Sequence, residues 1–244
     1  MSKGPSRTVK EPRYWAVVAS AGGGARMGLG RPKQYLPVYG RALLEWSLAP
    51  FLDAGWIDGI ALVLPKGDTE YAKLPIARHP KIVTVTGGAA RGESVLAGLE
   101  AVTERCLTLD APVFLLVHDA ARPCLTVEDV ETLRDEASDE QGGLLAMPLT
   151  DTLKSEERQR SLRTIGPAGL WRAQAPQLFR IDLLRTAYQQ AHGRNLHPVD
   201  EAEAMELAGF KPQLIRGRVS NLKVTYPEDL PLAEFWLSRR EYAR

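Results

Sequence analysis

The chain has 244 residues, 44% hydrophobic and 25% charged, so we expect a soluble globular protein with one large α/β domain or two small ones. A formal net charge of +1 argues against a protein that binds nucleic acid through bulk charge. Two cysteines make no disulfide framework or metal cluster, and no run of about 18 apolar residues predicts a membrane-spanning helix. We therefore expect a cytoplasmic protein with no membrane or nucleic-acid partner.

The first 13 residues, MSKGPSRTVKEPR, are polar and basic and lack the apolar core of a secretory signal. We expect a disordered tail over residues 1–13. A single domain is expected over residues 14–240.

A strand followed by a glycine-rich turn opens this domain. Residues 15–19 (WAVVA) form the short apolar run that is typical of a strand covered on both faces. The turn Ser20-Ala21-Gly22-Gly23-Gly24-Ala25-Arg26 lets backbone N–H groups converge on an anion such as phosphate. Arg26 and Lys33 would add positive charge, which phosphoryl transfer requires. The turn matches neither a Walker A loop nor G-x-G-x-x-G, so the alternative is a flexible turn with solvated charges.

Strands and helices then alternate as far as residue 148. We expect strands at 59–64, 81–86, 111–117 and 142–148, and helices at 41–49 (with Pro50 ending or kinking it), from Val95 onward, and at 126–137. This alternation predicts a Rossmann-like, doubly wound, mostly parallel sheet. Such sheets bind ligands at the carboxyl ends of their strands, where the Gly22, Gly88 and Asp119 turns all lie. The alternative is that each is only a turn.

Residues 150–168 break the alternation. Residues 150–154 and 161–165 resemble two short strands around the charged turn 156–160, so we expect a β-hairpin arm that leaves the domain. An isolated hairpin is marginal in water and normally packs on something. We therefore expect a homodimer with crossing arms, and the alternative is a flexible surface insertion.

The α/β pattern resumes after the arm. Residues 170–177 lead into a helix at 180–190, and Asp200 is placed to cap a helix at 201–208. A short strand follows at 214–216. The last helix begins at 226–229 and turns Leu230, Ala233 and Leu237 inward.

Motifs along residues 15–237 resemble one family of nucleotidyltransferases, the 2-C-methyl-D-erythritol 4-phosphate cytidylyltransferases of non-mevalonate isoprenoid biosynthesis. The matching pieces, in order, are Ala21-Gly22-x-Gly24-x-Arg26-Met27, Pro32-Lys33-Gln34-Tyr35-Leu36, Gly87-Gly88-x-x-Arg91-x-x-Ser94-Val95, His118-Asp119-Ala120-Ala121-Arg122-Pro123, Asp151-Thr152, Leu170-Trp171, Pro176-Gln177, Asp200-Glu201-Ala202 and Asn221-Leu222-Lys223-Val224-Thr225.

The resemblance implies a GT-A-type cytidylyltransferase that joins CTP to 2-C-methyl-D-erythritol 4-phosphate and releases pyrophosphate. It implies that Arg26 and Lys33 stabilise the triphosphate and the reacting phosphorus, and that Lys223 places the attacking phosphate. Mg²⁺ would be bound mainly through the CTP phosphates, with no metal site built from the protein. The residues implied to hold the nucleotide are Ser20, Ala21, Gly22, Gly24, Gly88, Ser94 and Ala120. Those implied on the substrate side are Asp119, Arg122 and, from the arm of a second subunit, Thr152.

Four positions depart from the family pattern. Pro167 stands where the family usually has an arginine that holds the substrate phosphate, and Ala175 and Val199 replace two threonines. Ala89 stands where an acidic residue usually follows the double glycine. We hypothesise that Arg163, on the arm, replaces the missing positive charge.

Two other functions stay open at this point. The altered substrate side leaves ribitol-5-phosphate cytidylyltransferase or another sugar-phosphate nucleotidyltransferase as one alternative. A non-catalytic nucleotide-binding protein is the other. His118 invites a general-base role, but a phosphate monoester is already ionised at neutral pH, which favours packing or hydrogen bonding for this residue.

Overall fold

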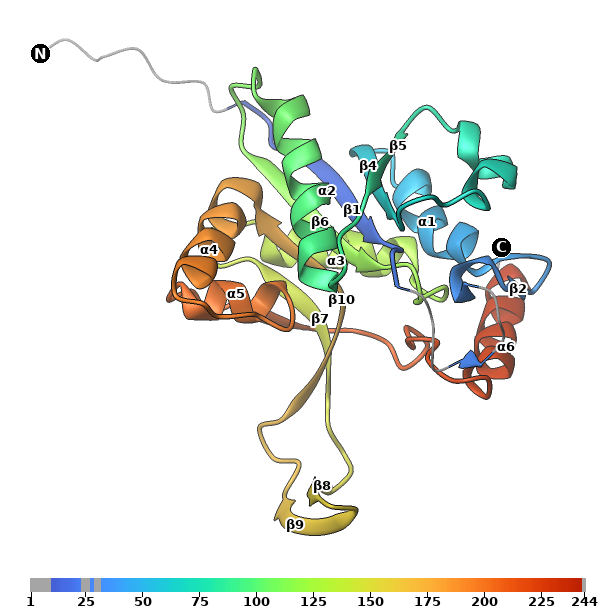
Figure 1. Cartoon of the computed structure of the whole chain (residues 1–244), viewed down its shortest axis with the longest axis vertical. Helices are drawn as coiled ribbons and strands as arrows, with labels where there is room; N and C mark the ends of the chain where they lie inside the picture. Colours follow the sequence, from blue (N-terminus) through green and yellow to red (C-terminus); the bar gives the residue numbers. More distant parts are fainter. Residues whose placement is uncertain (1–9, 23–26, 29–31, 243–244) are drawn as a thin grey trace, which may run out of the picture.

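The computed structural model describes residues 10–22, 27–28 and 32–242. Gly24 and Arg26 lie outside the described residues, as does most of the predicted tail. Within the described ranges the central sheet has seven strands, in the order β11-β7-β10-β6-β1-β4-β5 (Figure 1). These are β1 (Arg13–Ala19), β4 (Ile57–Leu64), β5 (Ile82–Thr86), β6 (Val113–Asp119), β7 (Gly143–Pro148), β10 (Trp171–Arg180) and β11 (Gln213–Arg216).

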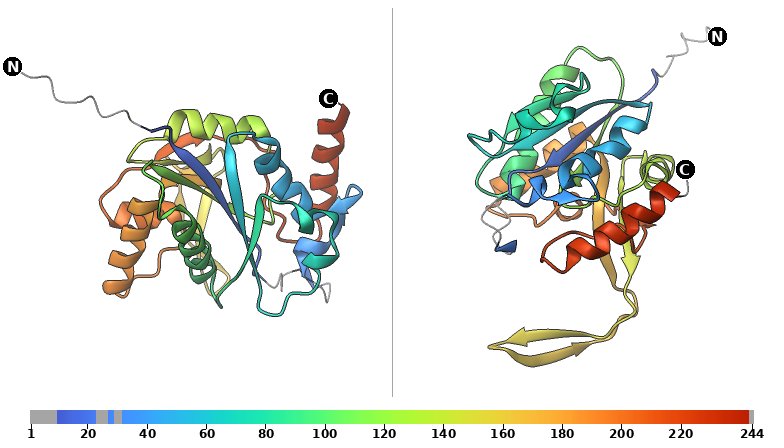
Figure 2. Two further views of the ribbon diagram at one scale, coloured as in Figure 1. Left: turned by 90° about the horizontal axis from the view of Figure 1, so that it is seen from above. Right: turned by 90° about the vertical axis from the view of Figure 1, so that its right-hand side faces the viewer.

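The sheet is mostly parallel, as the alternation predicted, and it is covered on both faces (Figure 2). Alternate residues of β1 point to opposite sides, so Val18 packs in one apolar cluster and Val17 in another. One face carries α1 (Leu43–Asp53) and α3 (Val127–Ala137). The other carries α2 (Arg91–Cys106), α4 (Ile181–Gly193) and α5 (Glu201–Leu207).

A third apolar cluster lies beside the sheet and holds the C-terminal helix α6 (Asp229–Tyr242). Ala233 and Leu237 of α6 are fully buried there, as their spacing predicted, against Val38 of β2 (Pro37–Val38). Strand β2 pairs with β3 (Arg41–Ala42). No helix in the described ranges combines the length and the apolar character that crossing a membrane requires.

Strand β10 was not expected from the sequence. Residues 171–177 were interpreted as a connection, but β10 runs antiparallel between β6 and β7. Its polar residues Gln174 and Gln177 hide the strand pattern, yet both are buried, because loop carbonyls accept from Gln174 Nε2 and Asp200 accepts from Gln177 Nε2. The prediction for the first helix was also inexact, since α1 continues through Pro50 to Asp53.

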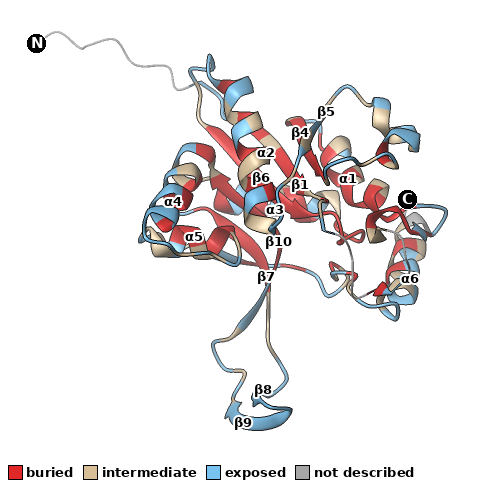
Figure 3. Ribbon diagram, viewed as in Figure 1, coloured by how far each residue is buried: buried red, intermediate tan, exposed pale blue. Residues whose placement is uncertain are grey.

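A two-stranded hairpin stands apart from the central sheet. Strands β8 (Leu153–Glu157) and β9 (Arg160–Ile165) pair only with each other among the described residues and project away from the domain (Figures 1 and 2). Arg158 and Gln159 form the turn between them with φ of 52° and 63°, the left-handed pair that tight hairpins favour. Nearly all of the hairpin is exposed (Figure 3).

Candidate active site

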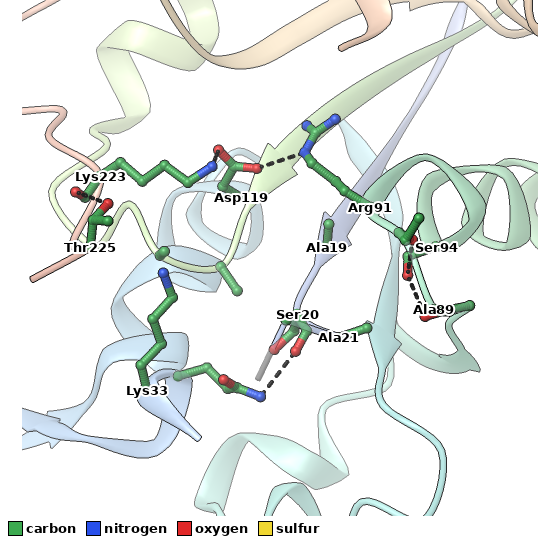
Figure 4. A pocket seen from close by; sticks show the side chains of 16 residues that line it. Ala19, Ser20, Ala21, Lys33, Ala89, Arg91, Ser94, Asp119, Lys223 and Thr225 are labelled. Atoms are coloured by element: carbon green, nitrogen blue, oxygen red, sulfur yellow. Dashed lines mark hydrogen bonds and ion pairs between the residues drawn. The ribbon is translucent and has the colours of Figure 1, made fainter. Parts of the chain in front are cut away.

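A pocket of about 390 Å³ lies at the carboxyl ends of β1, β5 and β6 (Figure 4). Parallel strands end at one edge of a sheet, so the turns that follow them meet there. The pocket brings together most of the residues that the motifs singled out. Its lining includes Ser20, Ala21, Gly22, Lys33, Gly88, Ser94, Asp119, Ala120 and Lys223.

The turn after β1 and the turn after β5 touch in this pocket. A Cβ atom added to Gly87 would lie 2.7 Å from Ser94 Oγ and 2.8 Å from Ala21 Cβ, so only glycine allows this approach. The turn after β1 is held by Gln34, whose Nε2 donates a 2.9 Å hydrogen bond to the Ser20 carbonyl. The two turns therefore form one wall on which a nucleotide can lie.

Residues 221–225 form a strap that ties the two candidate lysines together. Lys33 Nζ donates a 2.9 Å hydrogen bond to the carbonyl oxygen of Val224, the residue that follows Lys223. Arg122 Nη1 donates a 2.8 Å hydrogen bond to the carbonyl oxygen of Asn221 at the start of the strap. The strap thus places Lys223 and Lys33 on the same pocket, although the chain separates them widely.

Asp119, at the end of β6, is the charge centre of the site. Its Oδ1 lies 3.1 Å from Arg91 Nε, and its Oδ2 lies 2.9 Å from Lys223 Nζ and 3.4 Å from Arg122 Nε. Burial would raise the pKa of Asp119, but Arg91, Lys223 and Arg122 outweigh burial and hold its pKa well below the ordinary value. Asp119 is therefore a carboxylate at every pH at which the protein is expected to work.

Arg91 and Glu201 belong to the site, although the sequence assigned neither a role. Arg91 Nη1 and Nη2 donate hydrogen bonds of 2.7 Å and 3.1 Å to the two carboxylate oxygens of Glu201. Burial alone would lower the pKa of Arg91, but the Glu201 and Asp119 carboxylates raise it above the ordinary value. Both residues stood inside the motifs that match the family. The sequence signal that could have pointed to them is the position of Arg91 at a helix start, where the helix dipole disfavours positive charge and a carboxylate partner is needed.

A smaller pocket of about 200 Å³ adjoins the first and shares Arg91, Asp119 and Lys223 with it. Arg122 also lines this second pocket. Ala175 and Val199, two of the departures from the family pattern, lie in its wall, whereas Pro167 lies in the turn before β10. The two pockets form one cleft with two halves that meet at Asp119.

The arm residues do not line either half of the cleft in their own chain. Thr152 and Arg163 are exposed, and Arg163 lies on β9.

His118 packs in the core and lines neither pocket. It is fully buried, its ring lies 5.2 Å from the Phe51 ring, and its Nε2 is 3.4 Å from the Arg122 carbonyl oxygen. Burial lowers the pKa of His118 to about 3, so the imidazole is neutral. This geometry favours the packing role over the general-base role.

The side chains around Asp119 determine which kind of ligand this part of the cleft suits. The described residues hold no group of three or more histidine, cysteine, aspartate or glutamate side chains that could bind a metal ion. Asp119 faces three cations. This part of the cleft is therefore suited to an anion such as a phosphate.

A cleft with three cations around Asp119, on the carboxyl edge of a doubly wound sheet, suits an enzyme that acts on phosphorylated substrates, such as a nucleotidyltransferase. A family model described as 2-C-methyl-D-erythritol 4-phosphate cytidylyltransferase matches residues 14–239. The chain belongs to this family, whose members are cytidylyltransferases.

Curated relatives and solved structures agree with this assignment. The chain is 47% identical to 2-C-methyl-D-erythritol 4-phosphate cytidylyltransferase of Mannheimia succiniciproducens, over 92% of this chain and 96% of the relative. It is 46% identical to the enzyme of the same name from an Azoarcus species, over 94% and 96%. A crystal structure of 4-diphosphocytidyl-2C-methyl-D-erythritol synthase is similar with a TM-score of 0.81 and 33% identity, over 93% and 99%. The cytidylyltransferase of Thermus thermophilus has a TM-score of 0.75 and 32% identity, over 93% and 99%.

Proposed function

We propose that this protein transfers the cytidylyl group of CTP to the phosphate of 2-C-methyl-D-erythritol 4-phosphate and releases pyrophosphate. The observation that carries the proposal is the two-part cleft, in which Asp119, Lys223 and Arg91 line both halves. CTP takes the larger half, against Ser20, Ala21, Gly22, Gly88, Ser94 and Ala120. The sugar phosphate takes the smaller half, against Asp119 and Arg122.

The reaction needs no nucleophile from the protein. An oxygen of the sugar phosphate attacks the α-phosphorus of CTP, and the bond from that phosphorus to the pyrophosphate oxygen breaks with its electron pair leaving on pyrophosphate. The attacking phosphate is already ionised near neutral pH, so no general base is required. The protein contributes position and charge, and well-oriented groups supply up to about 7–11 kcal/mol of the barrier.

Two lysines carry most of the proposed charge stabilisation. Lys33 compensates the charge that builds up on the triphosphate, together with Arg26, which lies outside the described residues. Lys223 holds the attacking phosphate, and its 2.9 Å contact with Asp119 keeps the ammonium at the junction of the two halves. Fixed cations of this kind stabilise a transition state because they need no reorganisation when the charge develops.

CTP enters as its magnesium complex in this proposal, so the metal belongs to the substrate. Mg²⁺ commonly binds through substrate phosphates with few protein ligands, which suits a cleft whose aspartate already faces three cations. Because Cys106 and Cys124 are both free and buried, as is usual in a reducing compartment, we place the protein in the cytoplasm.

The arm is proposed to complete the cleft of a second copy in a homodimer. Strands β8 and β9 pair only with each other among the described residues, and an isolated hairpin is marginal in water unless it packs on another surface. Thr152 and Arg163 would reach the substrate half of the partner's cleft, where Ala175 and Val199 present only apolar side chains.

The test is pyrophosphate release with CTP, Mg²⁺ and 2-C-methyl-D-erythritol 4-phosphate, run in parallel with ribitol 5-phosphate. Turnover with the methylerythritol substrate alone is the expected result. Turnover with ribitol 5-phosphate alone would overturn the substrate assignment but keep the class. CTP binding by calorimetry without turnover on either substrate would show that the changes at Pro167, Ala175 and Val199 have ended this activity.

A further inference from the structure

Glu201 is a completely buried carboxylate behind the cleft, and it lines neither half. Its two oxygens accept hydrogen bonds of 2.7 Å and 3.1 Å from Arg91, and Tyr188 Oη donates a 3.1 Å hydrogen bond to Oε1. A buried charge with this set of partners is well compensated. The fork of the Arg91 guanidinium is thereby fixed in one plane, because both Nη groups are held.

The backbone around Glu201 is fixed by the sheet. Gln177 of β10 donates a 3.0 Å hydrogen bond to Asp200 Oδ2 and accepts one of 2.8 Å from the Ala202 N–H. Asp200 also caps α5 by accepting a 2.9 Å hydrogen bond from the Glu203 N–H. A single glutamine therefore holds the residues on both sides of Glu201, which makes its carboxylate a rigid anchor.

Arg91 connects Glu201 to the cleft. While one N–H of each Nη group bonds Glu201, the Nε–H group points to the cleft and lies 3.1 Å from Asp119 Oδ1. Since the guanidinium is planar and rigid, the direction of Nε follows from the position of Glu201. Arg91 is also the first residue of α2, where positive charge is unfavourable, so its position depends on these carboxylates.

The charges explain why the second carboxylate matters for Lys223. Among the described residues, Arg91, Arg122 and Lys223 all approach Asp119. Glu201 takes up part of the charge of Arg91 from the far side, and Arg91 contacts only Oδ1 of Asp119, so Oδ2 stays available to Lys223 and Arg122. Without Glu201, Arg91 would compete with Lys223 for Asp119, and the lysine would lose its defined position.

We propose that Glu201 is a positioning residue for the transfer reaction, which acts through Arg91 to hold Asp119 and Lys223 at the junction of the two halves of the cleft. The inference rests on the proposed function and extends it to a residue that touches no substrate. Stability alone does not explain the arrangement, because buried ion pairs are often no more stabilising than apolar residues of the same size.

The test is a double-mutant cycle. Glu201→Gln keeps the shape of the side chain and removes its charge, and Arg91→Gln removes the link. We expect Glu201→Gln to lower kcat about tenfold or more, with the KM for CTP changed less than threefold. In the Arg91→Gln background the same substitution should change kcat by less than twofold, because two changes on one path are not additive.

Controls separate positioning from folding. Glu206→Gln removes an exposed carboxylate from the same helix and should leave kcat and the melting temperature unchanged. Tyr188→Phe removes only the hydroxyl contact and should lower kcat two- to fivefold, so it keeps the inference testable if Glu201→Gln does not fold. Additive effects of Glu201→Gln and Arg91→Gln on kcat, in folded variants, would overturn the inference.

A second readout does not depend on turnover. In ¹⁵N-labelled protein the Nε–H group of Arg91, which is bonded to Asp119, should give a resonance protected from solvent exchange. Glu201→Gln should remove that protection, whereas Glu206→Gln should keep it. If the wild-type protein shows this pattern of protection but no transfer activity, the proposed function is rejected and the positioning by Glu201 stands. If Glu201→Gln keeps the protection, the inference about Glu201 is overturned and the proposed function is unaffected.

Discussion

Lys223 Nζ lies 2.9 Å from Asp119 Oδ2, so the proposed phosphate-binding cation is paired with a carboxylate before any substrate is present. The pair lies where the two halves of the cleft meet. Because Asp119 also faces Arg91 and Arg122, the cluster keeps a surplus of positive charge toward an incoming phosphate. This surplus is what an anionic substrate requires.

Replacing Asp119 by asparagine should uncouple this cluster. Three cations would lose their shared counter-charge, and removing one partner of a buried ion pair costs about 3–5 kcal/mol, reduced here because Lys223 and Arg91 are partly exposed. We expect kcat/KM for the sugar phosphate to fall about a hundredfold, and the melting temperature to fall as well. Steady-state kinetics and calorimetry measure the two effects, and unchanged kinetics in Asp119→Asn would contradict the assigned role.

Lys33→Ala tests the charge stabilisation at CTP. The loss of one well-placed cation costs about 2.7–4 kcal/mol, so kcat should fall about a hundredfold or more. The strap would also lose its 2.9 Å hydrogen bond from Lys33 to Val224. Pyrophosphate release measures the effect, with Lys66→Ala, an exposed lysine in the turn after β4, as the matched control. Near-normal turnover of Lys33→Ala would exclude this role.

The buried, neutral His118 should make stability depend on pH. Its pKa is about 3 in the folded protein against an ordinary value of 6.5, so between these values the unfolded chain binds one more proton. As the pH is lowered below about 6.5, the free energy of unfolding should therefore fall by about 1.4 kcal/mol per pH unit. Urea titrations from pH 7.5 to 5 measure the slope. His118→Gln should flatten it, and an equal slope in that variant would assign the effect to other groups.

Subunit mixing tests whether the arm acts on a second copy. Arg163→Ala should lower kcat/KM for the sugar phosphate about tenfold by removing a cation from the arm. A mixed dimer has one Arg163→Ala subunit and one Asp119→Asn subunit. The cleft of the first subunit is intact, and it receives the intact arm of the second. Equal mixing should restore about a quarter of wild-type activity, since half of the dimers are mixed and each has one complete site. Activity that stays at the level of the two separate variants would argue against crossing arms.

Gly87→Ala tests the contact between the two turns that form the nucleotide wall. The new Cβ would lie 2.7 Å from Ser94 Oγ, which forces a shift costing about 1–3 kcal/mol. We expect weaker CTP binding in calorimetry and a lower melting temperature. Gly92→Ala is the matched control, because its Cβ would meet nothing within 4 Å and alanine favours the helix. Equal behaviour of the two variants would show that the wall tolerates the shift.

The sequence by itself determined the sheet class, the three turns of the cleft and the family. Apolar runs such as WAVVA predict buried strands because both faces of a parallel sheet are covered, and the order of the strands then places their carboxyl ends on one edge. Asp119 could be selected because it ends such a strand and Lys33 because it follows the first glycine turn, whereas Lys223 was selected only through the resemblance to the family. The division into a tail and one domain stays a prediction.

Only the tertiary structure decided the rest. Strand β10 was hidden because Gln174 and Gln177 interrupt its apolar pattern, and their partners are distant in the chain. The role of Glu201 was hidden for the same reason, since an acidic residue at a helix start is usually solvated and stabilises the helix end. Its burial and its fork of hydrogen bonds to Arg91 arise when α2, α4 and α5 pack together, and no local pattern encodes that contact.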